Sequence, residues 1–360
     1  MTAERAPSTS DSIPIDRDYL ATQSQASSKD PQTYYLTHGL ADKLNPTRFF
    51  TTDWYAWQNP DWVSHPAPYL HDLEIGRHEG RDPSPFVDIH RYREATGLSG
   101  GVIYDLILSG HRSVALGVYD SQLDLRQCQH SFMNSITCLA HRIRRPAVQR
   151  NALVVLQCGR GSLAHSWFDD DGREWDLLVN YYDAEGFRPG FGDYVFFQKG
   201  TKFTALHQFW TRYRDILEPY DHVLFLDDDI STSCDALNRL VRACRSHDLD
   251  LAQMSLSEDS SCNWPALYSQ SGQSGPRPLS AVEIMMPVFS RQALRRCAVT
   301  LGLSVSGFGL DLAWGKIVGD AGGRIAILDD VVATHARPVD QSGGAYYSYL
   351  RRHGINAKAE

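Results

Sequence analysis

The feature that most constrains the fold is a regular alternation, from about residue 150 onward, of short apolar runs with stretches of helical spacing. The apolar runs are Ala152 to Leu156, Trp175 to Tyr181, Tyr194 to Phe197, His222 to Leu226 and Leu251 to Leu256. Between two of them, Phe203 to Tyr213 carries aromatic residues at helical spacing. Such alternation predicts an α/β domain with a mainly parallel sheet and flanking helices. Ligands of these sheets bind beyond the carboxyl ends of the strands.

The first 150 residues differ from the rest in composition and in sequence pattern. Residues 1–30 are rich in Ser, Thr, Gln and Asp, and we expect a flexible tail there. In residues 31–115 a glycine-centred motif recurs at Gly39, at Gly76 and more weakly at Gly110, with spacings of 37 and 34 positions. Repeats of this length indicate stacked supersecondary units, so we expect a small all-α repeat domain. The remaining divisions are a helical linker at 116–149, the α/β domain at 150–340 and a C-terminal tail at 341–360.

Composition excludes several classes of protein. Of the 360 residues, 42% are hydrophobic and 22% charged, which is typical of a globular chain and excludes a disordered or collagen-like one. A net charge of -8 argues against nucleic-acid binding, which needs a basic face. Seven cysteines without a Cys-x-x-Cys pair predict neither a zinc site nor a disulfide framework. Because we find no signal sequence and no bilayer-length apolar run, we expect a cytoplasmic protein.

Three carboxylates, Asp227, Asp228 and Asp229, directly follow the most hydrophobic predicted strand. Their mutual repulsion makes burial against a core strand costly without a cation. The alternation of a strand places Asp227 and Asp229 on one side, where their oxygens suit Mg²⁺ or Mn²⁺. Such an ion would bridge to a diphosphate and neutralise its charge as it leaves. An acidic triplet is more often a solvated turn, but the preceding Val-Leu-Phe-Leu run favours a site.

Two later segments carry further candidates. Gly307 and Gly309 allow the backbone to approach a ligand closely, and they precede Asp311 at the start of an apolar helix. Asp311 is either a first-turn charge favoured by the helix dipole or an acid in a cleft that deprotonates or orients an acceptor hydroxyl. His335 follows another predicted strand, and such a histidine is usually structural. It becomes a metal ligand only if the fold brings it to the Asp triplet.

These three blocks together resemble the GT-A glycosyltransferases. A closer resemblance is to an uncharacterised family named lysine-ketoglutarate reductase trans-splicing related. Its members share an Asp-acid-Asp strand end, a segment like Met-Pro-Val-Phe-Ser-Arg at 286–291, a Gly-Leu-Asp loop like 309–311, and a late Asp with a following His; all occur here in order. Residues 69–86 are similar to a small helical repeat attached to bacterial polysaccharide glycosyltransferases, which implies an accessory module.

The resemblance implies a GT-A-like, Rossmann-like catalytic domain that moves a sugar from a nucleotide-diphosphate sugar to a glycan or polysaccharide hydroxyl. It makes Asp227 and Asp229 the residues for the donor diphosphate and for Mn²⁺ or Mg²⁺, with His335 as a further metal ligand. Asp311 falls at the position of the catalytic base. The other implied site residues are Asp228, Gly159, Arg160 and Lys202 on the donor side, and Glu283 and Gly309 on the acceptor side.

Two other interpretations stay open. One is a non-catalytic module that binds glycan or nucleotide sugar while the repeats recruit a partner, although such a module needs no acid at Asp311. The other is a metal-dependent hydrolase, which would need more metal-binding His and Asp residues beside the triplet. We also expect residues 258–278 to form a flexible loop over the acceptor site. Peripheral association with the inner face of a membrane or with a biosynthetic complex is compatible with the sequence.

Overall fold

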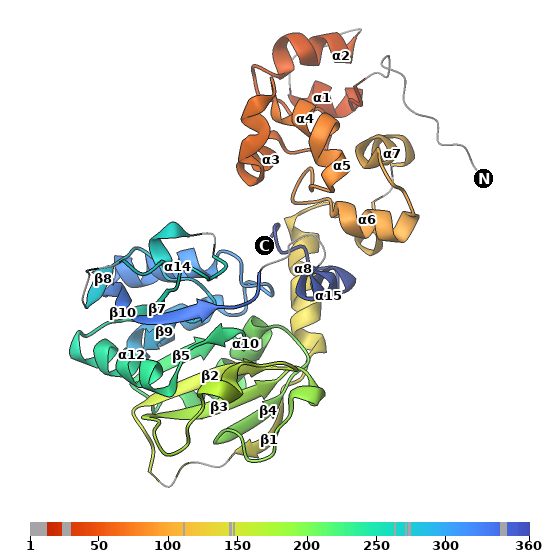
Figure 1. The fold of residues 1–360 in the computed structure, drawn as a ribbon. Coiled ribbons are helices and arrows are strands. Elements are labelled where there is room, and N and C mark those ends of the chain that lie inside the picture. The colour runs from red at the N-terminus through yellow and green to blue at the C-terminus, as the bar shows by residue number, and fades with distance from the viewer. Residues whose placement is uncertain are drawn as a thin grey trace. The chain divides into compact units, whose positions relative to one another are not determined.

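The computed structural model divides into two compact units (Figure 1). Unit 1 comprises residues 1–128 and 345–359, and unit 2 comprises residues 129–344 with Glu360. The structure describes residues 13–23, 30–110, 112–143, 146, 148–262, 264–270, 272, 275–338 and 344–360. Most of the predicted N-terminal tail, four positions of the predicted loop 258–278 and the start of the predicted C-terminal tail therefore lie outside the described residues.

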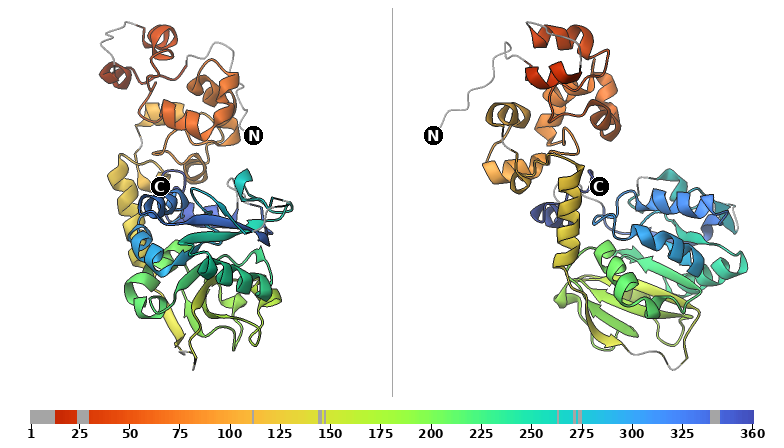
Figure 2. Two further views of the ribbon diagram at one scale, coloured as in Figure 1. Left: turned by 90° about the vertical axis from the view of Figure 1, so that its left-hand side faces the viewer. Right: turned by 180° about the vertical axis from the view of Figure 1, so that it is seen from behind.

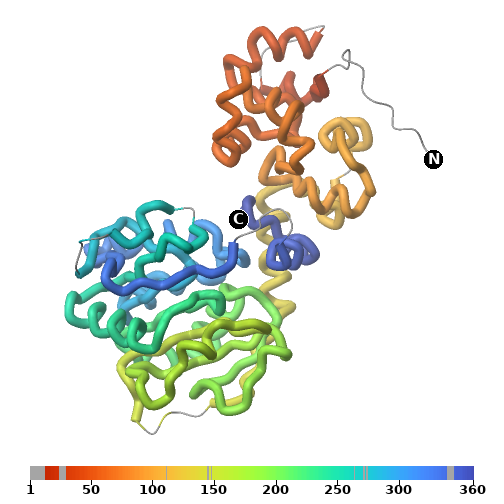
Figure 3. Tube along the Cα trace, in the orientation of Figure 1, coloured from red at the N-terminus to blue at the C-terminus, as the bar shows by residue number. Residues whose placement is uncertain are grey.

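Unit 1 is built from short helices (Figure 3). Some of them recur with the spacing of the sequence repeat. The helices are α1 (Arg17–Gln23), α2 (Pro31–Tyr34), α3 (Thr52–Gln58), α4 (Pro68–His71), α5 (Arg77–Glu79), α6 (Ile89–Thr96), α7 (Val102–Ser109), the beginning of α8 (Gln122–Ser135), and α15 (Ala345–Arg352). The starts of α2 and α4 are 37 residues apart, and so are those of α3 and α6. Gly39 and Gly76, with the same spacing, each end a π-helical turn.

Buried aromatic side chains form much of the core of unit 1. Tyr35, Phe50, Tyr55 and Tyr69 pack together in one cluster. At Gly76 an added Cβ would lie 2.1 Å from the Tyr55 hydroxyl oxygen, so this close approach of tyrosine and backbone requires glycine. The motif that marks the repeat in the sequence is therefore a packing feature of this unit.

Unit 2 contains a ten-stranded mixed sheet. Its strands are β1 (Leu139–Ile143), β2 (Ala152–Cys158), β3 (Trp175–Tyr181), β4 (Tyr194–Phe197), β5 (His222–Leu226), β6 (Ile230–Ser231), β7 (Leu251–Leu256), β8 (Pro276–Pro278), β9 (Val288–Ser290) and β10 (Ile325–His335). Their order is β1-β4-β3-β2-β5-β9-β7-β10-β6, and β8 pairs with β10. Because β9 lies antiparallel to both of its neighbours, strands β4, β3, β2, β5, β7 and β10 all run in one direction. The predicted α/β class with a mainly parallel sheet is confirmed.

Helices cover both faces of this sheet (Figure 2). They are α9 (Ala164–Trp167), α10 (Lys202–Arg212), α11 (Arg214–Leu217), α12 (Cys234–Ser246), α13 (Arg291–Cys297) and α14 (Leu310–Asp320). The core on one face includes Trp167 of α9 together with residues of α12, and the core on the other includes Trp314 of α14 with residues of α10, α11 and α13. Adjacent β2 residues alternate between the two cores, Val154 in the first and Val155 in the second, as expected for a strand buried on both sides.

Two segments differ from the sequence-based prediction. Residues 139–143, expected in a helical linker, form β1, an edge strand antiparallel to β4. The side chains of β1 are mostly exposed, so it lacks the continuous apolar run that marks the inner strands. Residues 345–352, expected in a tail, form α15, whose Leu350 is buried. Within the described ranges, we find no helix with the length and apolarity needed to cross a bilayer.

Candidate active site

Polar side chains gather at the edge of the sheet where its parallel strands end. β5 ends at Leu226, just before the Asp triplet, and β10 ends at His335. β2 ends at Cys158, just before Gly159. Because β9 runs against its neighbours, the segment that enters it, including Glu283, reaches this same edge. Ligands of α/β sheets bind at such an edge.

Asp229 and His335 contact each other. Pairing of β6 with the end of β10 places them side by side, with 3.4 Å between Nε2 of His335 and Oδ2 of Asp229. Nδ1 of His335 lies 2.6 Å from the carbonyl oxygen of Ser261, which can only accept, so Nδ1 donates. Burial disfavours the charged imidazole, but the contacts with Asp229 and Ser261 outweigh it and raise the pKa of His335 to about 9. Burial likewise opposes ionisation of Asp229, yet His335 lowers the pKa of that carboxyl.

Asp227 is paired with Lys202. The Nζ of Lys202 lies 2.9 Å from Oδ1 of Asp227 and also donates to the carbonyl oxygens of Phe225, Ile284 and Met285, at 3.3, 2.6 and 3.2 Å. Only 8% of the Lys202 side chain is exposed, against 33% for Asp227. Burial raises the pKa of Asp227 to about 6, although Lys202 acts in the opposite direction. Lys202 is therefore the internal counter-ion of Asp227, and its contact with a donor phosphate stays a prediction.

Asp228 holds the loop that follows β2. Its Oδ2 accepts hydrogen bonds from the N–H of Gly159 at 2.9 Å and from the Tyr182 hydroxyl at 2.8 Å. Nη1 of Arg337 lies 3.5 Å from Oδ1, and burial raises the pKa of Asp228. A Cβ at Gly159 would lie 2.2 Å from the Tyr182 ring, so glycine is required at this position. Arg160, beside it, is exposed and forms an ion pair at 2.8 Å with a glutamate.

Tyr182 and Arg337 are site residues that the sequence patterns did not single out. Their positions in the sequence could have identified both, because Tyr182 directly follows β3 and Arg337 follows His335 by two residues. Arg337 also donates to the carbonyl oxygen of Gly161 at 2.7 Å, which ties the end of β10 to the loop after β2. The guanidinium of Arg337 thus lies beside Asp228, at the edge of the sheet where the parallel strands end.

Glu283 and Asp311 lie on the predicted acceptor side. The N–H of Met285 donates to Oε2 of Glu283 at 2.8 Å. Burial raises the pKa of Glu283 to about 7, and the charges of Asp227 and Asp311 act in the same direction. Asp311 lies in the first turn of α14, directly after Gly309, and burial raises its pKa as well. Burial thus raises the pKa of both carboxyl groups, and that of Glu283 reaches the neutral range in which a group can exchange protons during catalysis.

The predicted loop 258–278 is fastened to the sheet. Arg277 of β8 forms a bidentate ion pair with Asp329 of β10, with Nε–Oδ2 and Nη2–Oδ1 distances of 2.7 and 3.0 Å. The Asp329 side chain is fully buried. The same segment supplies Ser261, whose carbonyl orients His335. In its described part, this segment is therefore anchored at Arg277 by a buried charge pair, whose partner Asp329 is the late Asp of the family pattern. The flexibility of the loop stays a prediction.

A divalent metal needs several oxygen or nitrogen ligands close together. In the described part of the chain, no group of three or more His, Cys, Asp and Glu side chains is arranged to hold a metal ion. Asp229 offers a carboxylate oxygen, and His335 beside it offers an imidazole nitrogen once a metal displaces the proton from Nε2. Mg²⁺ sites commonly use one or two carboxylates and complete their coordination with substrate phosphates and water. The pair supplies at most two ligands, so an ion bound here would take its remaining ligands from substrate and water.

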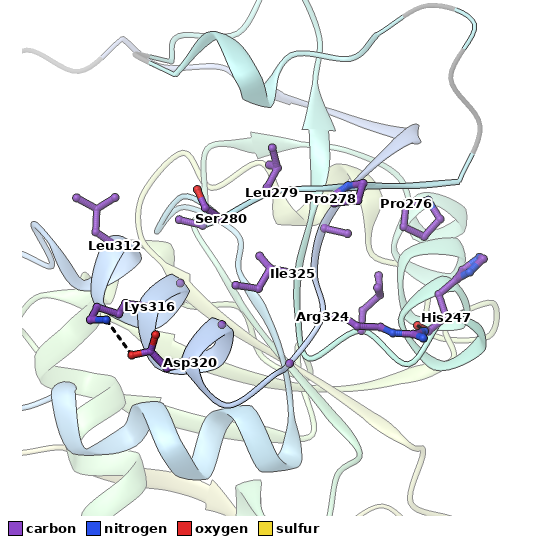
Figure 4. A pocket seen from close by; sticks show the side chains of 16 residues that line it. His247, Pro276, Pro278, Leu279, Ser280, Leu312, Lys316, Asp320, Arg324 and Ile325 are labelled. Carbon is purple, nitrogen blue, oxygen red and sulfur yellow. Dashed lines mark hydrogen bonds and ion pairs between the residues drawn. The ribbon is translucent and has the colours of Figure 1, made fainter.

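A pocket of about 790 Å³ lies elsewhere in unit 2. It is lined by α14 with the beginnings of β8 and β10, including Leu312, Arg324 and Ile325 (Figure 4). Ile325 starts β10, whereas His335 ends it, so the pocket lies toward the opposite end of that strand from the acids. The pocket is lined by none of the three Asp side chains that follow β5.

Comparison with known proteins adds three findings. A family described as Protein of unknown function (DUF707) matches residues 172–346, a range that includes the Asp triplet, Asp311 and His335. A search of curated proteins finds no match. Among solved structures, the chain is similar to the crystal structure of GalNAc-T7 with UDP, GalNAc and Mn²⁺, with 9% sequence identity and a TM-score of 0.39. That match covers 58% of this chain and 48% of the other, about half of its length.

Proposed function

We propose that this protein is a metal-dependent glycosyltransferase that moves a sugar from a nucleotide-diphosphate sugar to a hydroxyl of a glycan or polysaccharide. The observation that carries the proposal is the contact of 3.4 Å between Asp229 and His335, at the edge where the parallel strands end. Asp227 and Glu283, whose charges interact, lie at the same edge. The resemblance to GT-A glycosyltransferases implies the same chemistry.

On the donor side, Asp229 and His335 would hold Mn²⁺ or Mg²⁺, which would supply positive charge for the diphosphate. Asp228 keeps the backbone of Gly159 in place for the nucleotide. Arg337 and the exposed Arg160 offer guanidinium groups, which bind phosphate well because of their forked geometry.

On the acceptor side, Asp311 is the proposed base that takes the proton of the attacking hydroxyl. A general base works best when its pKa is near the working pH, and burial moves the pKa of Asp311 upward in that direction. Gly309 leaves room for the acceptor, since an added Cβ there would meet nothing within 4 Å. Glu283, with a pKa of about 7, would bind the acceptor or take over the base role. Positioning and electrostatics would supply most of the rate.

The donor site is tested by measuring the melting temperature with a panel of nucleotide diphosphates and nucleotide sugars, in Mn²⁺, Mg²⁺ or chelator. A ligand at a hundredfold excess over its Kd stabilises the folded protein by about 2.7 kcal/mol. We expect one nucleotide to raise the melting temperature only with metal, and this shift to disappear in Asp229→Asn and His335→Gln. Asp330→Asn, which changes an exposed carboxylate of β10, is the control that keeps it. No metal-dependent shift with any nucleotide would remove the donor site.

The reaction is tested by product analysis with the nucleotide sugar found in that screen. Asp311→Asn should lower kcat for transfer by about 10²–10⁴-fold, the usual contribution of a general base, while the nucleotide-induced shift persists. Glu283→Gln tests whether the base role belongs to Glu283 instead. Release of free sugar without transfer would indicate the hydrolase, and binding without turnover would indicate the non-catalytic module.

A further inference from the structure

A dense cluster of hydrogen bonds surrounds a carboxylate that the proposed reaction does not use. Oε1 of Glu360 accepts from the N–H of Val305 and from Nε2 of Gln129, both at 2.9 Å. Oε2 accepts from the N–H of Ser306 at 2.7 Å, from the Ser304 hydroxyl at 2.9 Å and from the Ser306 hydroxyl. Five donors thus converge on one side chain of unit 2. We call the donors of Gln129, Ser304, Val305 and Ser306 the carboxylate nest.

The carboxylate nest needs an anionic acceptor. Ser304, Val305 and Ser306 are all buried, and they belong to no helix or strand. Buried backbone N–H groups outside helices and strands need an acceptor from elsewhere in the protein. Leaving a buried N–H unpaired costs more free energy than one hydrogen bond contributes to stability. An ionised carboxylate forms stronger hydrogen bonds than a neutral group, and its two oxygens offer about four lone-pair sites, which the five donors share. Glu360 is therefore a structural requirement of this loop.

The carboxylate nest is continuous with the loop that leads to Asp311. The N–H of Gly307 donates to the Ser304 hydroxyl at 2.8 Å, and the N–H of Phe308 donates to the Ser306 hydroxyl at 3.2 Å. Gly307 has a φ of 87°, and a Cβ there would lie 1.9 Å from the Phe203 ring. The backbone conformation of this loop is therefore closely restricted up to Gly309, the N-cap residue of α14.

The same loop also contacts the helix that carries the counter-ion of Asp227. The carbonyl oxygen of Val305 accepts from the Thr201 hydroxyl at 2.6 Å. Thr201 is the N-cap residue of α10, and Lys202 is the first residue of that helix. The contacts made by Glu360 thus connect to both sides of the candidate site, to Asp311 through α14 and to Asp227 through α10.

We propose that Glu360 is a positioning residue, whose carboxylate keeps the loop of residues 304–309 in shape and thereby places Asp311. It touches no reacting atom. The catalytic part of this inference rests on the proposed function, whereas the carboxylate nest itself does not.

Hydrogen exchange followed by mass spectrometry tests the carboxylate nest without any activity. Glu360→Gln keeps the side-chain shape but turns an amide N–H₂ toward donors, so the amides of residues 304–309 should exchange about tenfold faster than in the wild type. Exchange in α12 should not change. Glu185→Gln, at an exposed ion pair with Arg160, is the matched control. Wild-type exchange in the loop of Glu360→Gln would overturn the inference.

A small carboxylate provides a second test. In Glu360→Ala, acetate should occupy the carboxylate nest, slow exchange in residues 304–309 and raise the melting temperature relative to chloride at equal ionic strength. Acetate should leave the wild type unchanged. If Glu360→Ala does not fold, Ser306→Ala, which removes one donor hydroxyl, should show faster exchange in the same loop. A variant that is insensitive to acetate would refute the assignment of a carboxylate site.

Steady-state kinetics distinguish a role of Glu360 in positioning Asp311 from a general loss of structure in the variant. In the transfer assay, Glu360→Gln should lower kcat about tenfold and change the KM for the donor less than about twofold, because the loop leads directly into α14 and Asp311 but reaches Asp227 only indirectly, through the Thr201 hydroxyl and α10. Acetate should restore part of kcat in Glu360→Ala. If the wild type is active and Glu360→Gln has the same kcat, the proposal that Glu360 positions Asp311 is refuted. An inactive wild type would refute the proposed function, while the exchange result would still decide the carboxylate nest.

Discussion

Removing the ion pair between Arg277 and Asp329 tests how residues 258–278 are fastened to the sheet. In Arg277→Ala, the Asp329 carboxylate keeps the N–H of Gln270 at 3.0 Å but loses guanidinium contacts of 2.7 and 3.0 Å. The Asp329 side chain is fully buried in the wild type, so the substitution leaves a buried charge without its main partner. Breaking a buried ion pair by removing one partner costs about 3–5 kcal/mol.

The lower stability of Arg277→Ala should be visible in the melting temperature and in its dependence on pH. For a unit of this size, 1 kcal/mol changes the melting temperature by about 2–4 °C, so the unit 2 transition should fall by about 6–20 °C. Arg277 holds the pKa of Asp329 below its usual range. A lowered carboxyl pKa contributes stability above the unfolded-state pKa that is lost as the pH falls through the folded-state pKa. The difference between wild type and Arg277→Ala should therefore shrink below about pH 4.

A matched control lies one residue further along β10. Arg239 pairs with Asp330 at 3.1 Å, and both side chains are exposed, so Arg239→Ala should cost only about 0–1 kcal/mol. The measurement is urea unfolding of the full chain, followed by tryptophan fluorescence, to which the buried Trp175 and Trp314 of unit 2 contribute. A cost for Arg277→Ala no larger than that for Arg239→Ala would refute the reasoning.

Two further substitutions test the packing of each unit. Gly307→Ala should cost about 2–5 kcal/mol in urea unfolding, because left-handed strain of about 1–2 kcal/mol adds to overlap with the Phe203 ring. Gly322→Ala, with a φ of 73° and open space around it, should cost the strain alone, and equal costs would contradict the overlap. Asp72→Asn should stabilise unit 1 at pH 8 by up to about 4 kcal/mol, because burial raises the pKa of this carboxyl to about 7 and its Oδ1 has no hydrogen-bond partner among the described residues. The gain should vanish below about pH 4, where the carboxyl is protonated in both states, and a gain that is independent of pH would argue against this origin.

The inner strands were predictable because a strand buried on both faces leaves a continuous apolar run. Trp175–Tyr181 and Leu251–Leu256 coincide with β3 and β7 residue for residue. The edge strand β1 leaves no such run, since its side chains face solvent. β9 is only three residues long, and its antiparallel direction depends on neighbours that are distant in sequence.

The acids of the candidate site could be located from the sequence, but their separate roles could not. Asp227, Asp228 and Asp229 look alike as a triplet, yet each has a different partner: Lys202 of α10, Tyr182 after β3 and His335 of β10. These partners arrive from three parts of the chain and meet only in the folded sheet. For the same reason, an abundant surface residue type such as lysine gave no indication that Lys202 is buried.

The central position of β9 has a consequence for biosynthesis. β5 pairs with β2 and β9, and β7 pairs with β10 and β9, so among the described strands β9 (Val288–Ser290) joins the two halves of the sheet. A ribosome releases the chain from its N-terminus, and segments fold as they emerge. Strands β1 to β5 can therefore assemble on the nascent chain while β7 still lacks both of its neighbours. We expect the second half of the sheet to join only after residue 290 has left the exit tunnel, so that one three-residue strand sets the order of assembly during translation.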